Sequence, residues 1–313
     1  MKIGLGTAAI GRPVYINIRK SDNVKPFDKL QFMKEGKNLL SSAYSNGIRH
    51  FDTAPGYGIA EQILLEWVRE NNITDITIST KWGYTYVADF NPEATVHEVK
   101  EHSLKKLNEQ WENSVNLSPL LNIYQIHSAT LNSGVLDNSQ VLKKLFELKK
   151  TYHLEIGLST SGENQNEIIK KALAIKVGEE LLFDSFQITY NIFDQSLSEI
   201  NELLKGKKII IKEALANGRI FPNDAFPNYL KAYNILVHLA NKYAVGIDAI
   251  ALRFCIDSLN PYLVLSGASK KEHLNANLMA EYFTLSDEDL KLLEQLKTNP
   301  KDYWLERKNL AWN

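Results

Sequence analysis

Short apolar runs alternate with longer amphipathic stretches along the chain from residue 27 onward. In residues 27–47, apolar side chains recur at helical spacing up to Gly47, which predicts a helix that ends at a glycine cap. Residues 59–70 place Ile59, Ile63 and Trp67 on one helical face. The same spacing predicts further helices near residues 93–109, 139–151, 163–175, 196–205 and 226–258.

Seven β-type runs separate these helices. Repeated βα units predict a parallel sheet with helices outside it, and an eight-stranded β/α (TIM) barrel fits a core of about 250 residues. A doubly wound open sheet is the structural alternative. The eighth strand is expected within residues 84–120, or is hidden by the approximate boundaries of the predicted elements. The absence of a Pro/Gly/Ser-rich linker predicts a single domain over residues 1–313. The seven runs are residues 48–54, 75–82, 120–127, 153–160, 183–189, 207–214 and 262–268.

The first glycines resemble a dinucleotide-binding turn. Gly4, Gly6 and Ala9 fit the spacing G-x-G-x-x-A, and Asp22 lies near the expected position of the ribose-binding acid. That motif needs a helix to begin at the glycines. Gly11 and the following proline disfavour one, so we expect no Rossmann site. Residues 2–7 are interpreted as a short strand or hairpin that caps the domain.

Composition indicates an ordinary globular protein. Hydrophobic residues make up 44% of the 313 positions and charged residues 23%, which argues against disorder. A net charge of −1 provides no attraction to nucleic acid or anionic lipid. No run reaches the ~18 apolar residues of a membrane span, and the N-terminus lacks a signal sequence. We therefore expect a cytoplasmic protein without nucleic-acid or membrane partners, and a buried, unreactive Cys255.

Four polar residues share one face at the ends of different predicted strands. Side chains of equal parity in a strand point the same way. If the apolar faces pack on the helices, then Asp52, Lys81, His127 and Gln187 point into the barrel at its carboxyl end, where barrel enzymes carry their reacting groups. A buried lysine and aspartate must pair. The alternative is a salt bridge that fills the barrel and has no chemical role.

Motifs spread over nearly the whole chain make the sequence resemble the aldo-keto reductase family, through their order and spacing together. That family is an eight-stranded β/α barrel which binds a nicotinamide cofactor without a Rossmann domain. The motifs are GLGT at 4–7, GIRHFDTAPGYG at 47–58, ISTKWG at 78–83, YQIHSA at 124–129, IGLSTSG at 156–162, FQITYNIFD at 186–194 and VLSGASKKEHLNANL at 264–278.

The resemblance implies a catalytic tetrad of Asp52, Tyr57, Lys81 and His127. Hydride reduction of a carbonyl builds negative charge on oxygen, which an acid must quench. We expect Tyr57 to be that acid, with a pKa lowered by the neighbouring Lys81 ammonium, which Asp52 keeps charged. His127 would orient the carbonyl oxygen.

The resemblance also implies a cofactor site. Ser159, Thr160 and Gln187 would hold the carboxamide, with Thr160 where the family usually has Asn, and Asp52 would contact the ribose. Lys212 stands near the usual position of a stacking aromatic residue; it would offer charge, lie near substrate or simply face solvent. Gly6 and Thr7 are further implied cofactor contacts. Leu215, Ala216, Asn217 and Gly218 would form the loop over the pyrophosphate, and Gly267, Ser269, Lys270, His273 and Asn277 would lie toward the adenosine.

Lys270 and Ser269 favour NADP over NAD, because both suit a 2′-phosphate. Tyr57, His127 and Trp82 are expected to contact substrate, although aromatic residues after Lys81 and in the tail more often serve packing. The histidines form no cluster with the spacing of metal ligands, so we expect no metal site. The expected function is reduction of an aldehyde or ketone, possibly sugar-like, or its reverse. The alternatives are a regulatory subunit resembling potassium-channel β proteins and an isomerase or lyase that uses tightly bound cofactor transiently.

Overall fold

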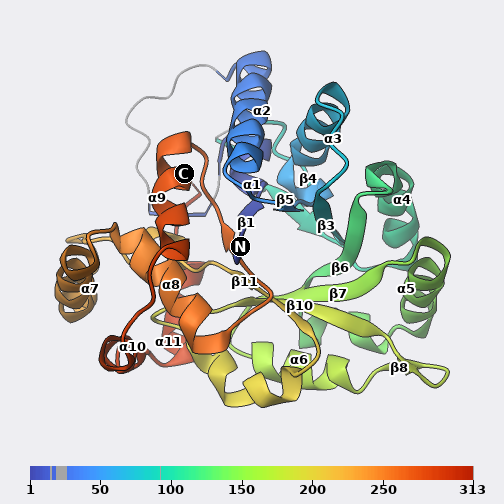
Figure 1. The fold of residues 1–313 in the computed structure, drawn as a ribbon. Helices are drawn as coiled ribbons and strands as arrows, with labels where there is room; N and C mark the ends of the chain where they lie inside the picture. The colour runs from blue at the N-terminus through green and yellow to red at the C-terminus, as the bar shows by residue number, and fades with distance from the viewer. Residues whose placement is uncertain (15, 19–26, 92, 313) are drawn as a thin grey trace.

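Eight parallel strands close into a barrel in the computed structural model, which describes residues 1–14, 16–18, 27–91 and 93–312 (Figure 1). The sequence-based expectation of an eight-stranded β/α barrel is therefore confirmed. Around the barrel the strands follow the order β1 (Ile3–Gly6), β12 (Leu263–Ser266), β11 (Lys208–Lys212), β10 (Phe183–Thr189), β7 (Glu155–Thr160), β6 (Leu121–Ala129), β3 (Thr77–Trp82) and β2 (His50–Asp52).

The eighth strand is β1, at the N-terminus, and the expectation that it lies within residues 84–120 is wrong. Leu5 pairs with Phe51 of β2, and Ile3 pairs with Val264 of β12, so β1 closes the barrel instead of capping it. The region 84–120 holds the antiparallel pair β4 (Tyr84–Tyr86) and β5 (Glu98–Lys100). Two glycines among the four residues of β1 leave the sequence without the usual alternation of a strand. The backbone passes close to β2 at the first of them, because a Cβ at Gly4 would lie 3.2 Å from the His50 carbonyl oxygen.

The residues after β1 form one helical turn, α1 (Ala8–Gly11), where no helix was expected. This turn is too short for a Rossmann helix, and both glycines of the G-x-G spacing belong to β1, which agrees with the rejected dinucleotide motif. Asp22 lies outside the described residues.

Helices surround the barrel on its outer side (Figure 1). The helix expected near residues 93–109 begins later, at Leu104, because the Ser103 side chain caps it by accepting from the Lys106 N–H and β5 occupies the preceding residues. The stretch 196–205 is a 3₁₀ helix, Ser196–Leu204. The α-helices are α2 (Lys29–Ser45), α3 (Ala60–Glu70), α4 (Leu104–Ser114), α5 (Ser139–Tyr152), α6 (Gln165–Leu173), α7 (Leu230–Tyr243), α8 (Ile247–Leu259), α9 (Lys271–Leu278), α10 (Asp287–Glu294) and α11 (Pro300–Lys308).

The core has two parts, which together fix the direction of the strand side chains. The larger part lies between strands and helices, and includes Phe51, Ile78, Ile126 and Phe186. A small apolar cluster of Ile123, Ile210, Leu263 and Leu265 lies apart from it. Because Ile123 shares the parity of His127 in β6, this cluster fills the barrel interior below the polar residues.

Among the described residues, no single helix has the length and hydropathy of a membrane span. The bent pair Pro227–Tyr243 and Ile247–Leu259 meets those criteria only when joined across a 90° break.

Candidate active site

A buried ion pair stands at the carboxyl end of β2 and β3. The Lys81 Nζ lies 2.5 Å from Asp52 Oδ2, and the two side chains are 0% and 2% exposed. Lys81 also donates to the Thr53 carbonyl at 3.0 Å. The other Asp52 oxygen, Oδ1, accepts from Ser79 at 2.7 Å and from Gln187 at 2.8 Å. The inward direction expected for Asp52, Lys81 and Gln187 is thus what the structure shows, and each oxygen of the carboxylate has a donor.

Tyr57 lies directly above this pair. It ends the 3₁₀ turn Pro55–Tyr57 that follows β2, and Gly58 leaves the turn at a φ of 65°, a left-handed conformation that glycine tolerates. The Lys81 Nζ is 4.7 Å from the Tyr57 ring centroid. The ring of His127 meets that of Tyr57 edge to face, with centroids 5.5 Å apart. The four residues of the expected tetrad therefore lie together.

The Tyr57 phenol is held in its neutral form. Burial raises its pKa well above the usual 10.0, and the Asp52 carboxylate raises it further. This direction is opposite to the lowering expected from Lys81, because burial has the largest effect on the pKa of the phenol and outweighs the lowering by the nearby Arg12 cation. Burial, together with the charge of Lys81, lowers the pKa of His127 well below 6.5, so its imidazole is neutral.

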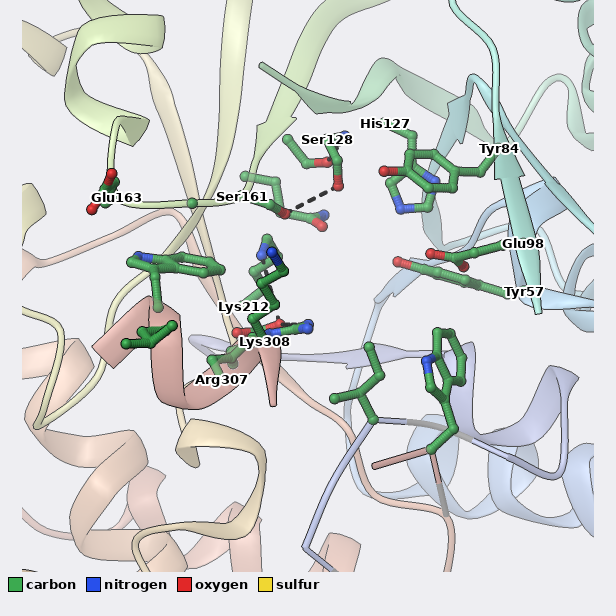
Figure 2. A pocket seen from close by; sticks show the side chains of 18 of the residues that line it. Tyr57, Tyr84, Glu98, His127, Ser128, Ser161, Glu163, Lys212, Arg307 and Lys308 are labelled. Carbon is green, nitrogen blue, oxygen red and sulfur yellow. Dashed lines mark hydrogen bonds and ion pairs between the residues drawn. The ribbon is translucent and has the colours of Figure 1, made fainter. Parts of the chain in front are cut away.

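A cavity of about 640 Å³ opens above these residues (Figure 2). Tyr57, Tyr84, His127 and Glu98 gather on one side of it, and Lys212 with Lys308 faces them from the other. The C-terminal segment completes the wall through Trp304 of α11 and Trp312. The other lining residues are Arg12, Ile16, Ser128, Ser159, Ser161, Gly162, Glu163, Gln187, Glu213, Lys301, Leu305 and Arg307.

Among the residues expected at the site, Thr160 and Trp82 point away from this cavity. Thr160 is fully buried, and its hydroxyl donates to Gln165 of α6 at 3.4 Å. Trp82 is fully buried in the outer core, where its ring meets His102 with centroids 5.4 Å apart. Both follow from strand parity, since each directly neighbours an inward residue, Ser159 or Lys81, and so points outward.

Lys212 does line the cavity, at the end of β11. Its Nζ donates to the Thr189 hydroxyl at 2.8 Å and lies 3.9 Å from Glu213. Burial lowers its pKa. The Lys212 ammonium is therefore largely buried and lies at the cavity wall.

The loop after β11 is held in a left-handed conformation. Ala216 and Asn217 have φ angles of 48° and 57°, and Gly218 follows at 91°. Asn217 accepts from the Ile18 N–H through its carbonyl and donates to the Ile16 carbonyl through its side chain. Leu215 is half-buried beside them. Residues 16 and 18 of the N-terminal segment are thus hydrogen-bonded to the loop that is expected to bind pyrophosphate.

The segment from β12 into α9 offers an open helix start. Gly267 is exposed, and a Cβ there would meet nothing within 4 Å. Lys270 precedes α9 without a side-chain cap, and both Lys270 and His273 are exposed, whereas Ser269 is half-buried. Asn277 instead is buried and bonded to the Ser266 hydroxyl at 2.7 Å.

Gly6 and Thr7 lie at the exit from β1. The Thr7 hydroxyl and N–H both donate to the Asp52 carbonyl, at 3.0 and 2.8 Å, and Thr7 is fully buried. Gly6 is paired with Asp52 in the barrel. Their placement supports the backbone of Asp52.

Sequence reasoning missed Arg12 and Glu98 as site residues. Arg12 comes from the segment after α1 and Glu98 from β5, and their ion pair at 2.8 Å borders the cavity. No spacing in the sequence links them, because only the folded chain brings residues 86 positions apart together. Among the described residues, no group of three or more His, Cys, Asp or Glu side chains could hold a metal ion.

Comparisons with known proteins agree with this geometry. The model of the Aldo/keto reductase family matches residues 2–298. The "Aldo-keto reductase YhdN" of Bacillus subtilis is 23% identical over 95% of this chain and 90% of its own. An Escherichia coli protein named "NADH-specific methylglyoxal reductase" is also 23% identical, over 83% of this chain and 86% of its own.

Solved structures share the fold. The holo form of an aldo-keto reductase from Bacillus halodurans has a TM-score of 0.69 and 19% identity, covering 95% of this chain and 91% of that one. Another neighbour, solved in complex with NADPH, has a TM-score of 0.64 and 19% identity, over 95% and 89% of the chains. With nearly the whole sequence matched by the family model, the chain belongs to the aldo/keto reductase family.

Proposed function

We propose that this protein reduces an aldehyde or ketone to an alcohol, or catalyses the reverse, with a nicotinamide cofactor and with Tyr57 as the general acid. The observation that carries the proposal is the position of the Tyr57 ring on the wall of one cavity, with its centroid 4.7 Å from the Lys81 Nζ and 5.5 Å from the centroid of the His127 ring. A protonated phenol beside a neutral imidazole can donate two hydrogen bonds to a single carbonyl oxygen.

The residues present fit a nicotinamide carboxamide. Ser159 Oγ accepts from the Ser128 N–H at 2.8 Å, which leaves its own O–H free to donate to an amide carbonyl. Gln187 donates to Asp52 through Nε2, and among the described residues no hydrogen bond reaches its Oε1, which can accept from an amide N–H. Both side chains line the cavity. When bound there, the cofactor would supply the hydride.

Each tetrad residue then has a separate task. Tyr57 donates its proton to the oxygen as negative charge develops on it. The Lys81 ammonium stabilises the phenolate that remains, and Asp52 holds that ammonium in place. His127 fixes the direction of the carbonyl oxygen. In the oxidative direction, the same groups take the proton from an alcohol.

The proposal favours NADP over NAD, on the supporting ground that Lys270, Lys271 and Ser269 surround the open start of α9. Unpaired N–H groups at a helix start suit a phosphate, and a lysine adds charge. Leu215, Ala216, Asn217 and Gly218 would cover the pyrophosphate, and His273 would lie toward the adenine. Since one relative carries the name of an NADH-specific enzyme, cofactor choice within the family requires a direct test.

A cofactor-coupled absorbance screen of aldehydes, ketones and alcohols, run with NADPH, NADP, NADH and NAD, tests the proposal. We expect turnover of at least one small polar carbonyl compound, because Ser128, Ser161 and Tyr84 give the cavity hydroxyl groups, and we expect a higher kcat/KM with NADPH than with NADH. Absence of turnover with every cofactor, alongside normal cofactor binding, would contradict the enzymatic function. A preference for NADH would overturn the cofactor assignment alone.

A further inference from the structure

Arg12 connects three separate parts of the site wall. Its Nη1 donates to the Gly56 carbonyl at 3.1 Å, within the turn that carries Tyr57. The same atom lies 2.8 Å from Glu98 Oε2 of β5. The guanidinium carbon lies 4.9 Å from the ring centroid of Trp312, near the C-terminus. Arg12 is only 3% exposed, so these contacts form inside the folded protein.

The backbone next to Arg12 packs tightly on the Tyr57 turn. The Gly11 carbonyl accepts from the Ile59 N–H at 2.9 Å. A Cβ at Gly11 would lie 2.0 Å from the Tyr57 carbonyl oxygen, and one at Gly58 would lie 2.4 Å from the Gly11 carbonyl oxygen. The two chain segments therefore meet without room for any side chain between them. This close approach gives the Arg12 guanidinium a fixed place relative to Tyr57.

Arg12 is also the second cation near the Tyr57 ring. Its guanidinium carbon lies 5.6 Å from the ring centroid, and Lys81 Nζ lies 4.7 Å from it. Burial has the largest effect on the pKa of the phenol and raises it; the carboxylates of Asp52, Glu98 and Glu213 raise it further, whereas Arg12 lowers it. The His127 ring also meets the Tyr57 ring; burial lowers the pKa of His127 most, and the charges of Lys81 and Arg12 lower it further, so its imidazole is neutral.

The geometry points to Arg12 as a positioning residue for Tyr57. Its guanidinium bonds to the Tyr57 turn and to Glu98 of β5, and it contacts the ring of Trp312. It also places a positive charge beside the phenol, which the Glu98 carboxylate partly offsets. This inference rests on the proposed role of Tyr57 as acid and base. It assigns to Arg12 and Glu98 the tuning of proton transfer, with no direct contact to the reacting carbonyl.

The test compares Arg12→Met with Glu98→Gln in the direction of alcohol oxidation, where kcat/KM rises with pH as Tyr57 loses its proton. We expect Arg12→Met to move that rising limb to higher pH and to lower kcat about tenfold, which corresponds to about one pKa unit. Glu98→Gln removes the opposing charge and keeps the bond from Arg12 to Gly56, so it should move the limb to lower pH. Dissociation constants for the cofactor should stay within about twofold of wild type in both variants, because neither residue is a proposed cofactor contact.

The inference is overturned if the rising limb of kcat/KM shifts in the same direction in Arg12→Met and Glu98→Gln, or if it shifts in neither variant. Arg12→Lys adds a third comparison, since it restores the charge without the planar fork; we expect it to return the limb toward wild type while kcat stays reduced. If Arg12→Met does not fold, Glu98→Gln alone tests the inference, because a rising limb at the same pH as in wild type would show that Glu98 does not affect proton transfer by Tyr57. A Tyr57→Phe variant measured in parallel separates the two levels: full turnover in that variant refutes the proposed function, not the placement of Arg12.

Discussion

The smallest unit of the site is the Asp52 and Lys81 pair. Both side chains are essentially inaccessible to solvent, so neither charge gains much from water. The pair is tolerated because the carboxylate also accepts from Ser79 and Gln187, and the ammonium also donates to Thr53. Removal of either partner would leave a buried charge without its counter-ion.

Lys81→Met should lower the free energy of unfolding by about 3–5 kcal/mol, because it leaves the Asp52 carboxylate buried and unpaired. Asp52→Asn alone leaves the Lys81 ammonium buried without its counter-ion. The double variant Lys81→Met with Asp52→Asn removes both charges, so it should lose less stability than the sum of the losses in the two single variants. Urea unfolding of the four proteins measures this coupling. Purely additive losses would show that the pair is not a coupled unit.

Strand parity explains why much of the site could be predicted from sequence. Asp52, Lys81, His127 and Gln187 lie on the inward face of their strands, and alternation along each strand reveals that face. The same rule places Thr160 and Trp82 outside the cavity, although their family motifs suggested otherwise. For residues on barrel strands, alternation is therefore the more reliable guide to direction.

Elements defined by tertiary contacts could not be predicted in this way. Strand β1 has four residues and two glycines, so its role in closing the barrel depends on partners more than 40 and 250 positions away. The cavity wall formed by α11 and Trp312 likewise arises from packing. The same holds for the pKa of Tyr57, whose direction is set by burial and by the charges around it, and not by the single lysine that the motif supplies.

Helix α3 carries the half-buried carboxyl group of Glu61, on the outer side of the barrel. Glu61 Oε1 accepts from Thr80 of β3 at 2.5 Å and from Ser114 of α4 at 3.0 Å. Burial raises the pKa of Glu61 from 4.5 to about 7. The folded chain therefore binds the Glu61 proton more tightly than the unfolded chain does.

The sign of the pH dependence follows from that difference. The contribution of protonated Glu61 to stability is complete below pH 4.5 and is lost as the pH rises through about 7. Glu61→Gln keeps both hydrogen bonds and cannot titrate, so we expect the variant to lose less stability than wild type between about pH 5 and about pH 8. Urea unfolding midpoints at the two pH values report the difference. An identical pH dependence in both proteins would contradict the raised pKa.

At the scale of the whole molecule, one end of the barrel assembles the site from distant segments. Strands β2, β3, β6, β7, β10 and β11 each contribute a side chain, and the N-terminal and C-terminal segments add Arg12 and Trp312. The opposite, interior end is filled by apolar side chains such as Ile123 and Leu263. This division gives the fold a stable base and leaves its carboxyl end free for chemistry.

The central claim is that Tyr57 delivers the proton, and Tyr84 provides a matched control. Tyr84 lines the same cavity with its ring centroid 4.6 Å from that of His127, and the Lys100 Nζ lies 5.8 Å from the centroid of the Tyr84 ring. Tyr57→Phe and Tyr84→Phe each remove one hydroxyl group from the same wall. Loss of an essential acid typically costs a factor of 10² to 10⁴ in rate.

The most direct measurement is single-turnover carbonyl reduction by the NADPH-loaded protein, with cofactor affinity measured on the same samples. We expect Tyr57→Phe to bind NADPH with unchanged affinity and to lose about 10²-fold or more in rate. Tyr84→Phe should remain within about tenfold of wild type. A rate for Tyr57→Phe equal to that of wild type, with cofactor bound, would contradict the account.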